Sequence, residues 1–69
     1  MKAFLKFYAD TPRGEINKRF TFKVNNLDDA VAAVKRFQGK GWNIRAAWCK
    51  WLAKDDVTWH NVQIFSIHI

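Results

Sequence analysis

One helical segment in the middle of the chain most constrains the fold, because every other periodic segment alternates like a β-strand. Its apolar residues recur every three to four positions, which indicates one helix from about Leu27 to Gln38. The expected core stripe is Leu27, Ala30, Val31, Val34 and Phe37. One helix covers one face of a small sheet, so the other face is expected to meet solvent, a second copy or a ligand.

Four segments alternate between apolar and polar residues as β-strands do. They are residues 3–9 and 16–24 before the helix, and 42–52 and 58–67 after it. Pro12 and Gly14 favour a turn within the first pair, and Asp55 favours one within the second. The sequence therefore predicts an α+β fold of order β-β-α-β-β, with a four-stranded, mainly antiparallel sheet and one helix packed on one face. The pattern leaves the strand order open.

The residues at both ends of the helical segment suit helix termini. Asn26 is a favoured N-cap, and Asp28 and Asp29 lie in the first turn, where the helix dipole stabilises negative charge. Gly39 is expected to take the left-handed conformation that ends many helices.

The length of 69 residues favours a single compact domain, residues 1–69, with one small core. Cys49 is the one cysteine, which excludes an intrachain disulfide and favours a reducing compartment. Residues 1–8 lack the continuous apolar run of a signal peptide, and no segment reaches the roughly 20 apolar residues of a membrane span. We therefore expect a soluble, cytoplasmic protein without membrane contact.

Positive charge is concentrated in the strand-like runs. Seven of the twelve Lys and Arg residues fall in them or, in the case of Lys2, directly before the first of them, and none of the six Asp and Glu residues falls in them. Those seven are Lys2, Lys6, Lys18, Arg19, Lys23, Arg45 and Lys50. Like charges directly opposite each other destabilise a sheet, so a sheet of one sign forgoes some stability. Together with a net charge of +6, this favours an anionic partner.

The turn lengths predict which side chains face each other on the uncovered side of the sheet. The expected pairs are Lys6 with Arg19 and Lys2 with Lys23 in the first hairpin, and Trp51 with Trp59, Cys49 with Asn61, Ala47 with Gln63 and Arg45 with Phe65 in the second. A slip of one residue would move each of these side chains to the opposite face.

Cationic and aromatic side chains on one sheet face suit single-stranded nucleic acid. Each stacked base contributes about 1 to 3 kcal/mol, and Lys and Arg neutralise phosphates. The candidate binding residues are Lys6, Arg19, Lys23, Arg45, Trp51 and Trp59. The alternative stays open that the cations are ordinary solvent-side residues and that the Trp residues fill out the core.

Residue types that perform catalysis or bind metals are sparse. Cys49, His60 and His68 lack the close paired spacing of zinc ligands. Cys49 and His60 could approach each other as a nucleophile and a base, but no third group is identifiable that would orient them. We therefore expect no metal, no cofactor and no enzymatic activity.

The chain as a whole resembles a small phage-encoded type I-F anti-CRISPR protein. The shared residues are Met1, Lys2 and Ala3, a helix starting at Leu27 with Ala30 inside it, and Trp51, Leu52, Ala53 and Lys54 followed by Asp55 and Trp59. The resemblance implies binding to the backbone subunits of a CRISPR surveillance complex, which would block access of target DNA to the guide RNA. It implies no individual contact residue.

Two functions from different classes are consistent with this sequence. The first is a non-enzymatic inhibitor, encoded by a phage or mobile element, that docks its uncovered sheet face on a nucleic-acid-handling complex of a bacterial host. The second is a stand-alone protein that binds DNA or RNA directly through a basic, aromatic sheet face. A homodimer paired through Phe4, Phe65 and Ile67 on the outer face is a third possibility.

Overall fold

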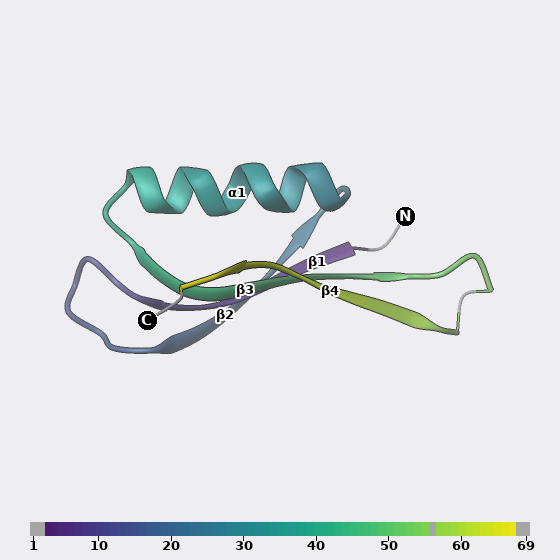
Figure 1. Ribbon diagram of the computed structural model, residues 1–69, viewed down its shortest axis with the longest axis horizontal. Helices are drawn as coiled ribbons and strands as arrows, with labels where there is room; N and C mark the ends of the chain where they lie inside the picture. Colours follow the sequence, from purple (N-terminus) through teal and green to yellow (C-terminus); the bar gives the residue numbers. More distant parts are fainter. Residues whose placement is uncertain (1–2, 56, 68–69) are drawn as a thin grey trace.

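The computed structural model describes residues 3–55 and 57–67. Its elements are β1 (Ala3–Asp10), β2 (Lys18–Val24), α1 (Leu27–Gly39), β3 (Asn43–Leu52) and β4 (Trp59–Ser66). The strands form one antiparallel sheet in the order β2-β1-β3-β4, and α1 covers one face of it (Figure 1). The predicted α+β fold is confirmed, and the structure adds the strand order. β1 and β3 are central strands, whereas β2 and β4 are edges.

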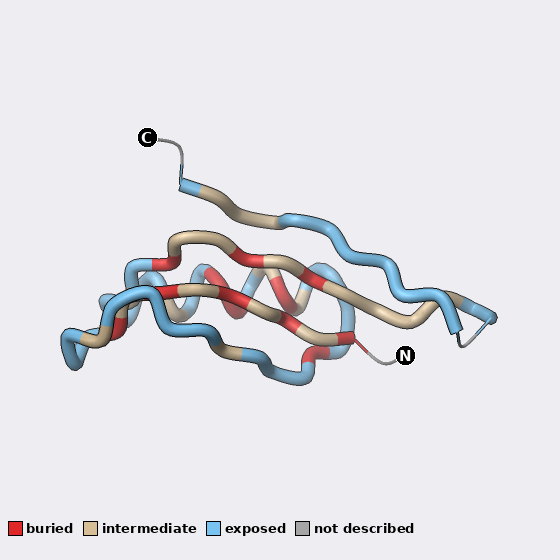
Figure 2. Tube along the Cα trace, turned by 90° about the horizontal axis from the view of Figure 1, so that it is seen from below, coloured by how far each residue is buried: buried red, intermediate tan, exposed pale blue. Residues whose placement is uncertain are grey.

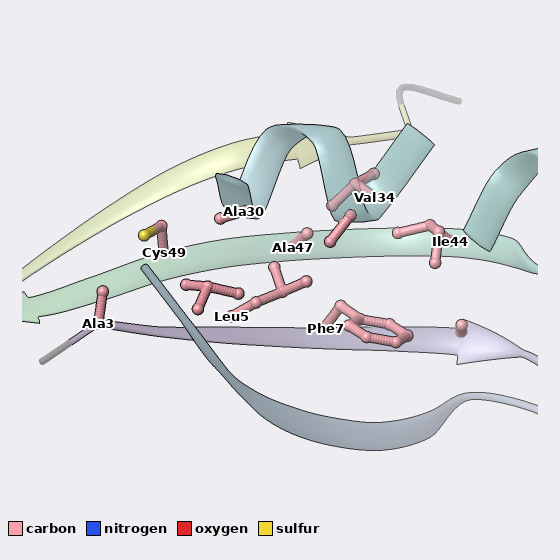
Figure 3. Packing of buried hydrophobic residues seen from close by; sticks show 11 residues of the cluster. Ala3, Leu5, Phe7, Ala30, Val34, Ile44, Ala47 and Cys49 are labelled. Carbon is pink, nitrogen blue, oxygen red and sulfur yellow. The ribbon is translucent and has the colours of Figure 1, made fainter. Parts of the chain in front are cut away.

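The core lies between α1 and the two central strands (Figure 3). Its buried residues are Ala3, Leu5, Phe7 and Ala9 of β1, Val24 of β2, Ala30, Ala33 and Val34 of α1, and Ile44, Ala47 and Cys49 of β3. Five of these are alanines, whose short side chains allow the helix to approach the sheet closely. The predicted helix stripe is confirmed at Ala30 and Val34, whereas Leu27 is exposed.

Phe7 lies at the centre of an aromatic cluster on the helix side of the sheet. Its ring centroid is 5.3 Å from that of Phe20, 5.1 Å from Phe37 and 6.2 Å from Trp42. Phe22 stacks on it as well, at 5.8 Å. Aromatic rings bury large areas per residue, so this cluster supplies much of the apolar burial of a short chain.

The ends of α1 confirm one capping prediction and correct another. The Asn26 side chain accepts a hydrogen bond from the backbone N–H of Asp29 at 2.8 Å, as an N-cap does. Gly39 is the last helical residue, and the left-handed glycine is Gly41, with a φ of 92°. The helix therefore continues one residue beyond the predicted end, and the chain turns two residues later than expected.

The first hairpin is shorter than the sequence predicts. Asn17 has a φ of 51°, which interrupts extended backbone, so β2 begins at Lys18 and Ile16 is 68% exposed in the loop. The predicted register is wrong by two residues: Lys6 pairs with Thr21, and Lys23 pairs with Phe4. Lys2 lies outside the described residues. Because the shift is even, every side chain stays on its predicted face, and the like-charge pairs are avoided.

Two bulges shift the alternation of the second hairpin. Between Tyr8 and Ala9, the partner in β3 changes from Ala46 to Ile44, which leaves Arg45 as the extra residue. A second shift leaves Ile64 as the extra residue of β4. A bulge adds one unpaired residue, and this reverses the faces on either side of it. Ile44 and Ala47 therefore both face the helix.

The turn between β3 and β4 is closed by Asp55. Its carboxylate accepts hydrogen bonds from the N–H groups of Thr58 at 2.9 Å and Val57 at 3.0 Å, and from the Thr58 hydroxyl at 2.7 Å. These bonds stabilise the ionised carboxylate and lower the pKa of Asp55 to about 2. The turn holds the two strands together at the end of the hairpin that extends beyond α1 (Figure 1).

Replacing Phe7 with Ala is expected to lower the free energy of unfolding by about 3 to 5 kcal/mol, because it leaves a cavity inside the aromatic cluster. Ile16→Ala is the matched control: it also truncates a large apolar side chain, but one that lies in the exposed loop. Its effect is expected to stay within about 0.5 kcal/mol. Chemical denaturation of both variants measures the difference, and equal losses would contradict the assigned core.

Candidate functional site

The face of the sheet opposite α1 carries aromatic and cationic side chains from all four strands. We call this surface the open face and define it by Phe4, Lys6 and Tyr8 of β1, Arg19 and Lys23 of β2, Trp48 and Lys50 of β3, and Trp59 of β4. Seen from that side, the two central strands alternate between buried and half-buried residues, and the edge strands are largely exposed (Figure 2). No element of the described residues lies over it.

Tyr8, Trp48 and Lys6 form one group on the open face. The rings of Tyr8 and Trp48 meet edge to face, with centroids 5.8 Å apart. The Lys6 ammonium lies 5.1 Å from the centre of the Trp48 ring, to which it is attracted by the ring's quadrupole. Lys6 and Trp48 are direct cross-strand partners, so the pairing of β1 with β3 sets this contact.

Phe4, Trp59 and Lys50 form a second group of the same composition. The Phe4 and Trp59 centroids are 6.0 Å apart, and the Lys50 ammonium lies 5.5 Å from the Trp59 ring centre. Trp59 is 47% exposed, which leaves much of its indole surface accessible. Phe4 and Tyr8 are four residues apart on one strand, so the two groups are separated by about 13 Å along β1.

Two further cations flank these groups on the β2 edge. Arg19 pairs with Tyr8, and Lys23 pairs with Phe4, so each aromatic group has a cation on the neighbouring strand. Both cations are exposed. The open face therefore presents rings near its centre and positive charge both between them and along one edge.

Among the described acidic residues, Asp10 alone lies on the open face, at the end of β1. The Arg45 guanidinium donates to both of its carboxylate oxygens, at 2.9 and 3.0 Å. The Asn17 backbone N–H and the Asn43 side chain donate to it as well. These contacts, with Arg45 the largest, hold the pKa of Asp10 well below its usual value. The negative charge of Asp10 is thus compensated locally by Arg45.

Four of the six candidate binding residues lie on the open face, and two do not. Lys6, Arg19, Lys23 and Trp59 lie on the open face as the sequence predicts. Arg45 occupies the bulge of β3, where its guanidinium is held by Asp10.

The predicted face of Trp51 is wrong. Trp51 pairs with Ala3 and faces the helix side, and it stacks on His60 with centroids 5.4 Å apart. Trp59 pairs with Leu52 instead. The cause is the bulge at Arg45, which turns Ala47, Cys49 and Trp51 inward. The second bulge, at Ile64, turns Phe65 to the helix side, where it packs against the core, so the predicted dimer contact through Phe65 on the outer face is wrong too.

Sequence reasoning missed Trp48 and Lys50 as members of the site. The predicted pairs put Cys49 and Trp51 on the uncovered side, so that strict alternation assigned Trp48 to the buried side, and the charged Lys50 interrupts that alternation. This interruption was the available signal, because a charged residue is rarely buried whereas a cysteine often is. Cys49 inside with Trp48 and Lys50 outside satisfies both tendencies, and this is the observed arrangement.

Cys49 and His60, the two described residues considered for catalysis or metal binding, lie on neighbouring strands. Cys49 is buried opposite Val62, and burial raises the pKa of its thiol, whereas His60 lies opposite Trp51. Across residues 3–55 and 57–67, no three His, Cys, Asp or Glu side chains gather where they could hold a metal ion. His68 lies outside these ranges.

The chain was compared with protein-family models, curated proteins and solved structures, and no match was found in any of the three. The resemblance to anti-CRISPR proteins thus stays a prediction from the sequence. Among the described residues, no helix is long and apolar enough to cross a membrane.

The Asp10–Arg45 contact predicts a pH dependence of stability. Because the pKa of Asp10 is lower in the folded chain than in the unfolded chain, its stabilising contribution is complete above the unfolded pKa of about 4 and is lost as the pH falls through the folded value. Asp10→Asn should therefore destabilise the chain most near neutral pH, and the difference from wild type should shrink in acid.

Urea unfolding of both proteins between neutral and acidic pH measures this difference. In an Arg45→Ala background, the same substitution should have a smaller and less pH-dependent effect, because the largest cause of the shift is gone. A loss that is constant with pH would contradict the assignment.

Proposed function

We propose that this chain is a non-enzymatic protein that binds single-stranded nucleic acid on its open face. The observation that carries the proposal is the pair of matched groups, in each of which a Trp ring, a second aromatic ring and a Lys ammonium are in contact. Rings offer stacking surfaces for bases, and ammonium groups beside them are placed to meet the phosphates of the same strand.

The aromatic rings favour unpaired bases over a duplex. Bases in a duplex stack on each other and expose only their edges, so a ring on a sheet can stack only on a base that is unpaired. Other four-stranded sheets use exposed aromatic side chains to stack two or three bases, and this is an analogy of architecture alone. The two groups lie about 13 Å apart along β1, which offers two separate stacking positions on one strand of nucleic acid.

The arrangement of charge supports the same partner. The Trp48 and Trp59 rings hold the ammonium groups of Lys6 and Lys50 against the sheet. Arg19 and Lys23 add two exposed cations on the β2 edge. Arg45 has no phosphate contact in this proposal, because its guanidinium is engaged by Asp10.

Binding to labelled single-stranded DNA and RNA is expected to weaken log-linearly with salt, by about 0.7 of a log unit per phosphate contacted and per decade of salt. Lys23→Gln removes a cation of the open face and should reduce this slope by about 0.7. Lys35→Gln is the matched control, since it removes an exposed cation from α1 and should leave the slope unchanged. No binding at low salt to any single strand would end the proposal.

The two neighbouring tryptophans of the second hairpin give a sharp test of stacking. Trp59→Ala should weaken binding about 5- to 150-fold, the equivalent of about 1 to 3 kcal/mol for one stacked base. Trp51→Ala should leave affinity unchanged, because Trp51 faces the helix side. Trp59→Phe keeps a ring and should retain part of the affinity.

Fluorescence anisotropy at fixed salt measures these affinities, and circular dichroism checks that each variant is folded. If Trp51→Ala weakens binding as much as Trp59→Ala while both variants stay folded, the open face is not the binding surface.

A second candidate function is the inhibitor that the sequence resemblance implies. One observation favours it. The β3–β4 hairpin extends beyond α1 (Figure 1), and its end holds three of the residues that carry the resemblance, Trp51, Lys54 and Trp59. A projecting hairpin is accessible to a large complex. Co-purification with a host CRISPR complex that then fails to capture target DNA would support this function, and normal capture would exclude it.

A further inference from the structure

The two edges of the sheet differ in charge. β2 carries Lys18, Arg19 and Lys23, whereas β4, with the sequence WHNVQIFS, contains no Lys, Arg, Asp or Glu. In natural sheets, charged residues, prolines, bulges or short strands at the edges prevent pairing with a further strand. The β2 edge is protected in this way, and most of the β4 edge is not.

The first part of β4 is regular and open to solvent. Residues 59–63 are all exposed and pair with β3 without interruption, and the bulge at Ile64 comes only after them. In the described part of the chain, no strand pairs with the outer side of β4. Figure 2 shows this first part of β4, in pale blue, along the outer margin of the sheet. Its outward N–H and C=O groups are therefore available to another strand.

We propose that β4 pairs antiparallel with β4 of a second copy of this chain, so that the two sheets become one. A two-fold axis sets the same segment against itself, which requires a self-complementary strand. For residues 59–63 this places no like charges opposite each other. The equivalent pairing of β2 about Thr21 would set Arg19 opposite Lys23 of the partner subunit, which is unfavourable.

The net charge of the chain also favours this edge. Two copies with a formal charge of +6 each repel one another, so an uncharged margin is the place where they approach at least cost. Across the new ladder, Val62 contributes an apolar contact on the helix side, and the side-chain amides of Asn61 and Gln63 can hydrogen-bond on the open side.

The pairing goes beyond the proposed function and does not depend on it. If both hold, the open faces of the two copies lie on the same side of one continuous sheet. The Trp59 groups of the two subunits are then brought toward the shared axis, because Trp59 belongs to the strand that pairs.

Sedimentation equilibrium over a range of concentrations tests the dimer, which should have twice the mass of the chain. Val62→Lys should raise the dissociation constant by about a hundredfold, because the interface then juxtaposes like charges. Val62 is 41% exposed, so a lysine can extend its ammonium to water in the monomer. Val57→Lys is the control: it adds the same charge at a turn residue that is 77% exposed, and it should leave dimerisation unchanged.

Single cysteines at Asn61, Val62 and Gln63 provide a second measurement that does not need Val62→Lys to fold. Near a two-fold axis, a residue lies close to its own copy, so at least one of the three should form an intermolecular disulfide rapidly under mild oxidation. Cys49 is buried and should not compete. A chain that stays monomeric at every concentration, or a dimer that resists Val62→Lys and gives no disulfide at the three positions, would overturn the proposal.

Salt separates this result from the nucleic-acid proposal. Screening reduces the repulsion between two positively charged copies and should strengthen the dimer, whereas it weakens phosphate binding. Val62 faces the helix side, so monomeric Val62→Lys should still bind a short oligonucleotide through its open face. Loss of dimerisation with retained binding therefore counts against neither the fold nor the proposed function.

Discussion

The packing of α1 against β1 and β3 is the contact on which the rest of the molecule depends. It buries alanines on both sides of the interface, so the helix lies close to the sheet, and Leu5 and Phe7 fill the space that remains. In a chain of 69 residues there is no second apolar layer of this kind among the described residues. Every polar and aromatic side chain on the other face is thereby left for solvent or a partner, and this determines where a function can be located.

Two single-residue bulges decide which side chains reach that face. Without the bulge at Arg45, the alternation of β3 would direct Cys49 outward and Trp48 and Lys50 inward, and both cation–ring contacts would be lost. The same bulge brings the Arg45 guanidinium to Asp10. A local irregularity thus organises the surface chemistry of the whole central part of the sheet, in agreement with the tendency of bulges to re-aim side chains next to sites.

Much of the fold follows from periodicity, and much of the surface does not. The strand and helix segments, the N-cap at Asn26 and the helix-facing residues of β1 were predictable because alternation and helical spacing are local properties of the sequence. The face of Trp51 was not, since it depends on a bulge opposite Tyr8 that no turn length records. The left-handed conformation of Asn17 displaced the register of the first hairpin. Because the displacement is two residues, the side chains of β2 stayed on their predicted faces. The predicted faces of the candidate residues were therefore correct on β1, on β2 and at Trp59 of β4, and wrong at Trp51 of β3.

Cys49 has a consequence for how this protein can be studied. It is the single cysteine of the chain, it lies fully buried beneath the helix, and that burial raises the pKa of its thiol. Thiolates react with alkylating reagents and buried thiols do not, so modification requires that α1 separate from β3. The rate of modification in native buffer is then a direct readout of how often this layer opens, obtained without denaturant and at a side chain that points away from the open face.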